Sequence, residues 1–462
     1  MFKRYIGDRA FYRRVMGVVL PIVVQNGITN FVSLLDNIMV GQIGTLQMSG
    51  VSIVNQLMFV FYLCIFGAVS GAGIFTAQFY GSGDEDGVRH TFRFKFLSAI
   101  LLTLLGIGTF ILAGQPLIRL YLQGDGDPKD VAMTLAYGSD YMRIMLLGLL
   151  PFALANAYSS TLRETGQTMV PMVSGIIAVC LNLVLNYILI FGHFGVPEMG
   201  VRGAAVATVI SRYVEFAVVA GWTHLHGEKN PFIQGAYRSI RIPRTLFVGI
   251  IIKGMPLLIN EALWSVGVAI LNQCYSVRGL DVIAAINISS TLTDLASVVF
   301  LSMGNCVGII IGQMLGAGKS EEEVRDTDNK LIAASVASCL IFGLLMVFAS
   351  DLFPQIYNTT ETVRAIATRL IWVAAAVMPC RAYCNAAYFT LRSGGQTMVT
   401  FLFDSCFVWC CSVPMAFCLS RFTGLPIIPL YLICNCMELI KCALGYYMIR
   451  KGTWIQNLAK SE

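Results

Sequence analysis

Charged residues are scarce in this chain, because Lys, Arg, Asp and Glu make up only 13% of its 462 residues, against about 25% in soluble domains. The chain has only four His, and its 14 Cys contain no CxxC pair of the kind that binds zinc. Walker A, GxSxG and HExxH motifs are also missing. We therefore expect neither an enzyme nor an ATP-driven machine, and no cofactor.

Apolar residues are abundant, at 56% of the chain. A chain of this length cannot hide so much apolar surface from water, so its solvent must be lipid. A spanning helix needs roughly 20 apolar residues, which predicts an all-α integral membrane protein. About twelve such runs are found, at 15–43, 50–79, 92–118, 132–160, 169–193, 199–222, 247–276, 284–314, 330–355, 364–390, 399–420 and 425–450.

Basic residues are concentrated in the segments that a twelve-helix arrangement places on one side of the membrane. Short cytoplasmic loops carry an excess of Lys and Arg, so we expect a multi-pass protein of the cytoplasmic membrane with both termini in the cytoplasm. Because most basic residues lie in these segments, the net charge of +6 does not indicate a nucleic-acid partner. Membrane lipids are the expected surroundings.

The sequence repeats itself in two halves. An offset of 235 residues superposes GIFTAQFYGSG at 73–83 on GIIIGQMLGAG at 308–318, and also pairs Pro21 with Pro256. An offset of 229 superposes LRETGQTMV at 162–170 on LRSGGQTMV at 391–399. Chance is a poor explanation for two matches in the same order.

The repeat predicts two six-helix lobes, at residues 1–223 and 247–462, joined by a cytoplasmic linker at 224–246. Six is an even number, so both lobes enter the membrane from the same side, and an axis along the membrane normal should relate them. Rocking one lobe against the other would give alternating access to a cavity between them. Two fused lobes already enclose such a cavity, so we expect a monomer.

At these blocks the chain resembles the MATE family, the multidrug and toxic compound extrusion transporters, over nearly its whole length. The blocks are PIVVQNGITNFVSLLDNIMVGQIG in the first span, the Gln-x-x-Gly-x-Gly segment 78–83, the loops TLRETGQT and TLRSGGQT, and GVRGAAVAT at 200–208. The pattern is closer to the DinF-like than to the NorM-like branch, since the helix-ten acid of the latter is missing and Arg381 and Asn385 lie around that position. The resemblance implies a MATE-like fold and cation-coupled export of amphipathic, often cationic compounds, driven by an H⁺ or Na⁺ gradient.

Asp36 is an acid inside the first span, with no Lys or Arg three or four residues later to neutralise it. An ionisable group at membrane depth costs a few kcal/mol, so it indicates a function. Binding a proton or a sodium ion would remove the charge. The family resemblance assigns the same residue, as the coupling acid of the first lobe.

In the DinF-like branch that acid works with polar residues on helices five and six, which the matching motifs place at Asn182, Asn186 and Thr208. The two Asn are four residues apart and therefore share a helix face. Their oxygens could complete a Na⁺ site with Asp36 or bind the protonated acid. Hydrogen bonding between helices is the structural alternative for all three.

A second set of polar residues lies at similar depth and is a candidate for substrate binding. Glu261 and Asn260, in the seventh span, pair at offset 235 with Asn26 and Gln25 in the first, and Asp294 lies in the eighth. Acids here suit an organic cation. Among the remaining membrane charges, Arg212 is expected to pair with Glu215 and Lys441 with Glu438, each three residues apart, and Asp404 is expected in a hydrated or paired site.

Two alternatives stay open at this point. A flippase or exporter of lipid-linked or polar metabolites would keep the fold, but such proteins tend to have a strongly cationic cavity, whereas the unpaired membrane charges here are mostly acidic. A channel or a membrane-embedded enzyme would belong to another class. The leading interpretation is a secondary antiporter for small organic molecules.

Overall fold

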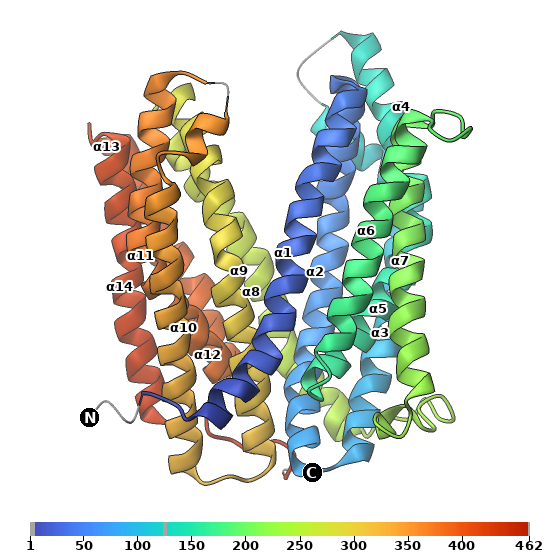
Figure 1. Ribbon diagram of the computed structural model, residues 1–462, viewed down its shortest axis with the longest axis vertical. Coiled ribbons are helices and arrows are strands. Elements are labelled where there is room, and N and C mark those ends of the chain that lie inside the picture. The colour runs from blue at the N-terminus through green and yellow to red at the C-terminus, as the bar shows by residue number, and fades with distance from the viewer. Residues whose placement is uncertain (1–4, 123–126, 358, 461–462) are drawn as a thin grey trace. The chain divides into compact units, whose positions relative to one another are not determined.

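The computed structural model describes residues 5–122, 127–357 and 359–460, without the side chains of Leu34, Asn37 and Leu280. The described residues are almost entirely helical, and twelve helices are long and apolar enough to cross a membrane, which confirms the predicted all-α membrane fold (Figure 1). The helices are α1 (Arg9–Ile43), α2 (Thr45–Ser82), α3 (Glu85–Tyr121), α4 (Pro128–Met145), η2 (Leu146–Gly148), α5 (Leu149–Glu164), α6 (Met169–Phe191), α7 (Gly200–Leu225), η3 (Pro231–Ile233), α8 (Arg244–Ser276), α9 (Leu280–Gly316), α10 (Glu321–Ala349), η4 (Phe353–Ile356), α11 (Glu361–Ser393), α12 (Thr397–Phe401), η5 (Leu402–Cys406), η6 (Val408–Ser412), α13 (Val413–Phe422) and α14 (Ile427–Lys451).

The helices form two compact units. The N-terminal unit consists of Val24–Thr76 and Glu85–Val248, and the C-terminal unit takes the chain up to Val23, the tip of α2 at Ala77–Asp84, and the chain from Gly249 onward. Helices α1 and α2 therefore contribute to both units.

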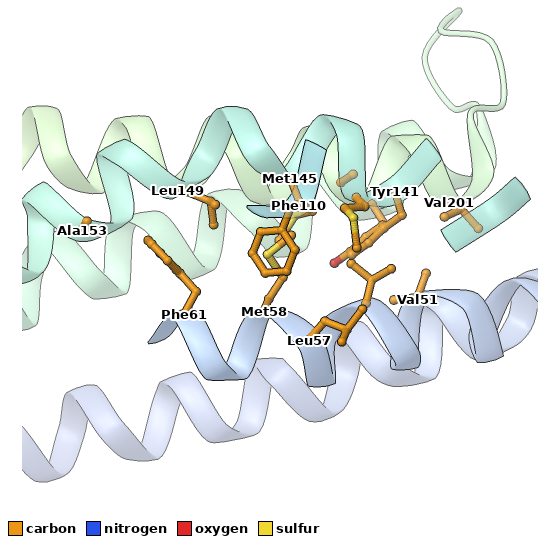
Figure 2. Packing of buried hydrophobic residues seen from close by; sticks show 14 of the residues in the cluster. Val51, Leu57, Met58, Phe61, Phe110, Tyr141, Met145, Leu149, Ala153 and Val201 are labelled. Carbon is orange, nitrogen blue, oxygen red and sulfur yellow. The ribbon is translucent and has the colours of Figure 1, made fainter. Parts of the chain in front are cut away.

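The core of the N-terminal unit is a large apolar cluster between α2, α3, α4, α5 and α7 (Figure 2). Met58 and Leu149 are fully buried in it. Helices α6 and α7 pack together closely because Gly203 has no side chain: a methyl group there would lie 2.6 Å from the carbonyl oxygen of Leu189. The glycine of the GVRGAAVAT block is thus a close-packing residue, as small residues commonly are between membrane helices.

The close contact of Gly203 with α6 leads to a prediction about the stability of the protein. Gly203→Ala should force α6 and α7 apart and lower the apparent melting temperature, since overpacking costs about 1–3 kcal/mol. Gly221→Ala, in the same helix α7, is the matched control. Nothing lies within 4 Å of a methyl group there, and Ala favours a helix by about 1 kcal/mol over Gly. A thermal-unfolding assay in detergent on both variants checks the expectation, which fails if the two melt alike.

The C-terminal unit is built around α9 and α11, against which α10 and α14 pack. One of its apolar clusters also takes in the start of α1 through Val15, Val19 and Ile22. The tips of α2 and α9 touch through their backbones: a methyl group on Gly81 would clash with the carbonyl of Gln313, and one on Gly316 with that of Gln78. This mutual approach explains why the tip of α2 belongs to the C-terminal unit.

The Gln-x-x-Gly-x-Gly segment has a structural role in the same place. The side-chain nitrogen of the buried Gln78 donates to the carbonyl oxygens of Ser393 at 2.9 Å and Gln456 at 3.2 Å, and its oxygen accepts from the Leu458 amide at 2.6 Å. One glutamine therefore ties the tip of α2 to the end of α11 and to the C-terminal segment.

The segment 224–246, predicted to be a linker, begins in the last residues of α7 and ends in the first turn of α8. It contains the turn η3 and packs against α3, where the Arg93 guanidinium donates to the carbonyl oxygens of Ala236 at 2.7 Å and Gly235 at 2.9 Å. Phe92 of α3 lies against the ring of Phe232. These contacts lie within the N-terminal unit and hold the segment against its helices.

Candidate functional site

Asp36 of α1 lies in a polar cluster inside the N-terminal unit. The side-chain nitrogen of Asn186, on α6, donates to Oδ1 of Asp36 at 2.7 Å. Asn182, one turn earlier, lies 3.3 Å from the hydroxyl of Thr208 on α7. Asn182 and Asn186 are 7% and 2% exposed. The structure thus brings together the four residues that were predicted to form the ion-coupling site. Their role in coupling remains a prediction.

The amide of Asn182 has a preferred orientation. With its nitrogen turned toward Asp36 it donates to Oδ2 at 2.7 Å and to Oδ1 at 3.1 Å. With its oxygen there, two acceptors would face each other, so we assign the nitrogen to that position. Both amides then bind the carboxylate, and such charge-assisted hydrogen bonds are about twice as strong as neutral ones.

The cluster suits a proton or a monovalent cation. A cation there could be bound by the carboxylate, by the hydroxyl and, once the two amides turn, by their oxygens, all of which are hard ligands. The buried Oδ1 of Asn186 accepts no hydrogen bond from any described residue, so it is available to a further ligand. No group of three or more His, Cys, Asp or Glu that could hold a metal occurs among the described residues, and a single carboxylate fits Na⁺ better than a multivalent metal.

The residues proposed for substrate binding belong to different units. Gln25 and Asn26, both half-buried, lie in the N-terminal unit. A methyl group on Gly175 of α6 would lie 2.8 Å from the side-chain nitrogen of Gln25, so Gln25 packs closely against that helix. This contact is consistent with packing as well as with binding, and the assignment of both residues to substrate stays a prediction.

In the C-terminal unit, Asn260 does not face open space. It is 1% exposed and donates to Oδ2 of Asp404 at 3.1 Å, while its own oxygen accepts from the backbone and hydroxyl of Ser405. Glu261 interacts electrostatically with Asp404 and Arg392, and the exposed Asp294 with Arg381. Asn260 is therefore held by Asp404 and Ser405, and its assignment to substrate, like that of Glu261 and Asp294, stays a prediction.

The prediction that Lys441 pairs with Glu438 is wrong, because Glu438 is not its closest ion-pair partner. The Lys441 ammonium lies 2.5 Å from Oδ1 of Asp404 instead. Glu438 still interacts with Lys441, but only as a neighbouring charge. Asp404 was expected in a hydrated or paired site, and the paired alternative is confirmed.

The predicted ion pair of Arg212 with Glu215 is also absent among the described residues. Arg212 donates to the hydroxyl of Tyr62 at 2.5 Å, and its guanidinium lies 5.2 Å and 5.0 Å from the ring centroids of Tyr62 and Phe152. Glu215 interacts with Arg212 and Arg163 as a more distant charge. The aromatic rings of α2 and α5 thus stabilise this membrane cation.

Sequence reasoning missed a buried ion pair between α3 and α5. The ammonium of Lys95, which is fully buried, contacts Glu164 and donates to the hydroxyls of Ser160 at 3.0 Å and Thr161 at 3.3 Å. The carboxylate of Glu164 fills the space that a side chain on Gly73 would need. The TLRETGQT block and the glycine of GIFTAQFYGSG are therefore parts of one packing arrangement.

Breaking this pair should be strongly destabilising. Lys95→Met leaves the Glu164 carboxylate without its main partner, and removing one member of a buried pair costs about 3–5 kcal/mol. Lys95→Met combined with Glu164→Gln should recover most of the loss, because the second change removes the isolated charge. Thermal unfolding of the two variants beside the parent protein measures this, and equal destabilisation of both would contradict it.

Comparison with known proteins agrees with this architecture. The MatE family model matches residues 21–188 and 256–418, which is more than half of the chain. The chain is 23% identical over 470 residues to the probable multidrug resistance protein NorM of Thermotoga maritima, covering 98% of this chain and 96% of the relative. It is 26% identical over 426 residues to the probable multidrug resistance protein YoeA of Bacillus subtilis, covering 90% and 89%.

The fold matches solved structures as well. A structure described as an outward-facing conformation of a multidrug resistance MATE family transporter of the MOP superfamily superposes with a TM-score of 0.86 at 16% identity, over 97% of each chain. The two segments that match the family fall one in each half of the repeat, and they contain the blocks that carried the resemblance except GVRGAAVAT at 200–208. On this match, and on its twelve spans, the chain belongs to the MatE family of membrane transporters.

Proposed function

We propose that the protein is a secondary active antiporter that exports small amphipathic or cationic organic compounds in exchange for H⁺ or Na⁺. The names of its relatives describe multidrug resistance, which supports efflux of varied compounds. The observation that carries the coupling is the Asp36 carboxylate inside a membrane helix, held by two amides from α6. A carboxylate at this depth is stable only when its charge is compensated.

The proposed cycle needs no covalent step. Without a cation, the amide nitrogens of Asn182 and Asn186 donate to Asp36. A proton neutralises the carboxylate directly, whereas Na⁺ would be bound by the carboxylate once the amides turn their oxygens toward it. Either ion removes the charge and with it the reason for the amides to hold α1 against α6. A ligand can drive a conformational change only by binding two states differently. Here the ion would favour the state in which the amides no longer hold α1 against α6.

The ion site of the proposal follows the DinF-like pattern, with Asp36, Asn182, Asn186 and Thr208 as its ligands. Asn186 replaces a second acid that this branch can carry, so only one negative charge is present. We propose organic cations as cargo because Glu261 and Asp294 are acids at membrane depth. We propose that the protein lies in the cytoplasmic membrane as a monomer, with both termini inside the cell.

The experiment uses purified protein in liposomes loaded with a fluorescent organic cation. An H⁺ gradient and a Na⁺ gradient are imposed separately, and protein-free liposomes provide the background. Movement of the dye against its own gradient, driven by one ion and stopped by an ionophore for that ion, is expected. Dye movement that only follows its own gradient would overturn antiport.

A further inference from the structure

The C-terminal unit contains a half-buried carboxylate, that of Asp404, whose oxygens are both occupied by the protein itself. Oδ1 of Asp404 lies 2.5 Å from the Lys441 ammonium, and Oδ2 accepts from the side chain of Asn260 at 3.1 Å. The Lys441 side chain is 9% exposed and that of Asp404 18%. The three residues come from three helical segments, η5, α14 and α8.

The Lys441 ammonium makes the contacts that a free monovalent cation would make in this site. Besides the carboxylate, its ammonium lies 5.3 Å from the centroid of the Phe403 ring, a distance at which a ring face attracts a cation. Glu438 adds a further negative charge nearby. A buried ammonium is costly unless it is paired and hydrogen-bonded, and these contacts compensate it.

The backbone around Asp404 is adapted to this arrangement. Residues Leu402–Cys406 and Val408–Ser412 form π-helical turns, which are rare and often occur at functional sites. Ser405, next to Asp404, donates through its backbone nitrogen to the side-chain oxygen of Asn260 at 3.2 Å, and its hydroxyl lies 2.8 Å from that oxygen and 2.7 Å from the backbone oxygen of Asn260. Asn260 is thereby fixed with its nitrogen toward Asp404.

The ligands resemble those at Asp36, where amide side chains also flank one carboxylate. The difference is that no described Lys or Arg forms an ion pair with Asp36, whereas Asp404 has an ammonium. We propose that Asp404 and Asn260 form a monovalent-cation site that the Lys441 ammonium permanently occupies. The C-terminal unit then keeps a constant charge at Asp404, and the neighbouring Glu261 is left to respond to ions or to cargo. This inference does not depend on coupling at Asp36.

Shortening Lys441 should open the site to cations from solution. The test compares Asp36→Asn with Asp36→Asn/Lys441→Ala, so that Asp36 cannot contribute, by thermal unfolding at neutral pH in Na⁺, propylammonium or the bulky cation choline. Only the variant lacking Lys441 should be stabilised, saturably, by Na⁺ or propylammonium. A tenfold excess over Kd should raise its apparent melting temperature by about 2–4 °C.

Two further variants decide the interpretation. Adding Asp404→Asn to the double variant should abolish the stabilisation, and Lys441→Arg in the Asp36→Asn background should show none, because it retains a cation. If Lys441→Ala aggregates, recovery of monodisperse protein with and without propylammonium during solubilisation replaces the melting measurement. Stabilisation that survives Asp404→Asn, or unfolding and recovery unaffected by small cations, would overturn the proposal.

Discussion

Replacing Asp36 with Asn should abolish gradient-driven export while leaving the protein folded. Asn keeps the shape and can still hydrogen-bond Asn186, but it neither takes up a proton nor carries a charge. At an effective dielectric constant of about 20, a carboxylate attracts a cation 4 Å away by roughly 4 kcal/mol. Losing it should weaken cation binding by about a thousandfold, which puts the site out of reach of the available ion gradient.

The matched control is Asp140→Asn. Asp140 is in the same unit but forms an exposed ion pair with Arg202, and exposed pairs contribute little. Its gradient-driven export in the liposome assay should equal that of the parent protein. Asp36→Asn should instead reach the protein-free background while eluting as the same monodisperse species. Export retained by Asp36→Asn would remove this residue from the coupling step and direct attention to Glu261.

Asn186→Leu should produce the second largest effect. It preserves the size of the side chain but deletes the 2.7 Å hydrogen bond to Asp36 and the free oxygen. Hydrogen bonds to charged groups contribute about 1.5–3 kcal/mol, so half-saturation by the coupling ion should need about 10–100-fold more of it. Maximal export at saturating ion should change much less.

The control here is Asn156→Leu. Asn156 lies in α5 and donates to the carbonyl oxygen of Phe152 in its own helix. Both variants lose one amide inside the N-terminal unit, but only one loses contact with Asp36. Measuring initial export rates over a range of ion concentrations separates them. Identical half-saturation in the two variants would mean that Asn186 serves only to join α6 to α1.

Local patterns in the sequence were sufficient to predict the spans, whereas the Asp36 cluster was predicted with the help of the family resemblance. Apolar runs of spanning length need no tertiary information, and two amides four residues apart must share a helix face. An acid without a nearby base had to be compensated by other helices. The repeat and the family motifs then indicated which helices these were, and Asn182 and Asn186 lie beside Asp36.

The charge pairs could not be predicted in the same way. The rule that residues three or four apart pair on a helix led to Glu438 for Lys441 and to Glu215 for Arg212. The contacts found here instead join different helices. Asp404 is 37 residues from Lys441, and Tyr62 is 150 residues from Arg212. Pairs so far apart in the sequence cannot be recognised from the local spacing of residues.

The contact between the tips of α2 and α9 has the symmetry of a homodimer. Gln78 and Gln313, and Gly81 and Gly316, are equivalent positions of the repeat, and each glycine meets the glutamine of the other copy. Such isologous contacts arise when two identical chains meet across a twofold axis. Fusion into one chain frees the two sides to specialise: Gln78 now binds the C-terminal segment, while Gln313 accepts from Arg14. Two equivalent positions of the repeat thus hold the two ends of one polypeptide by different contacts.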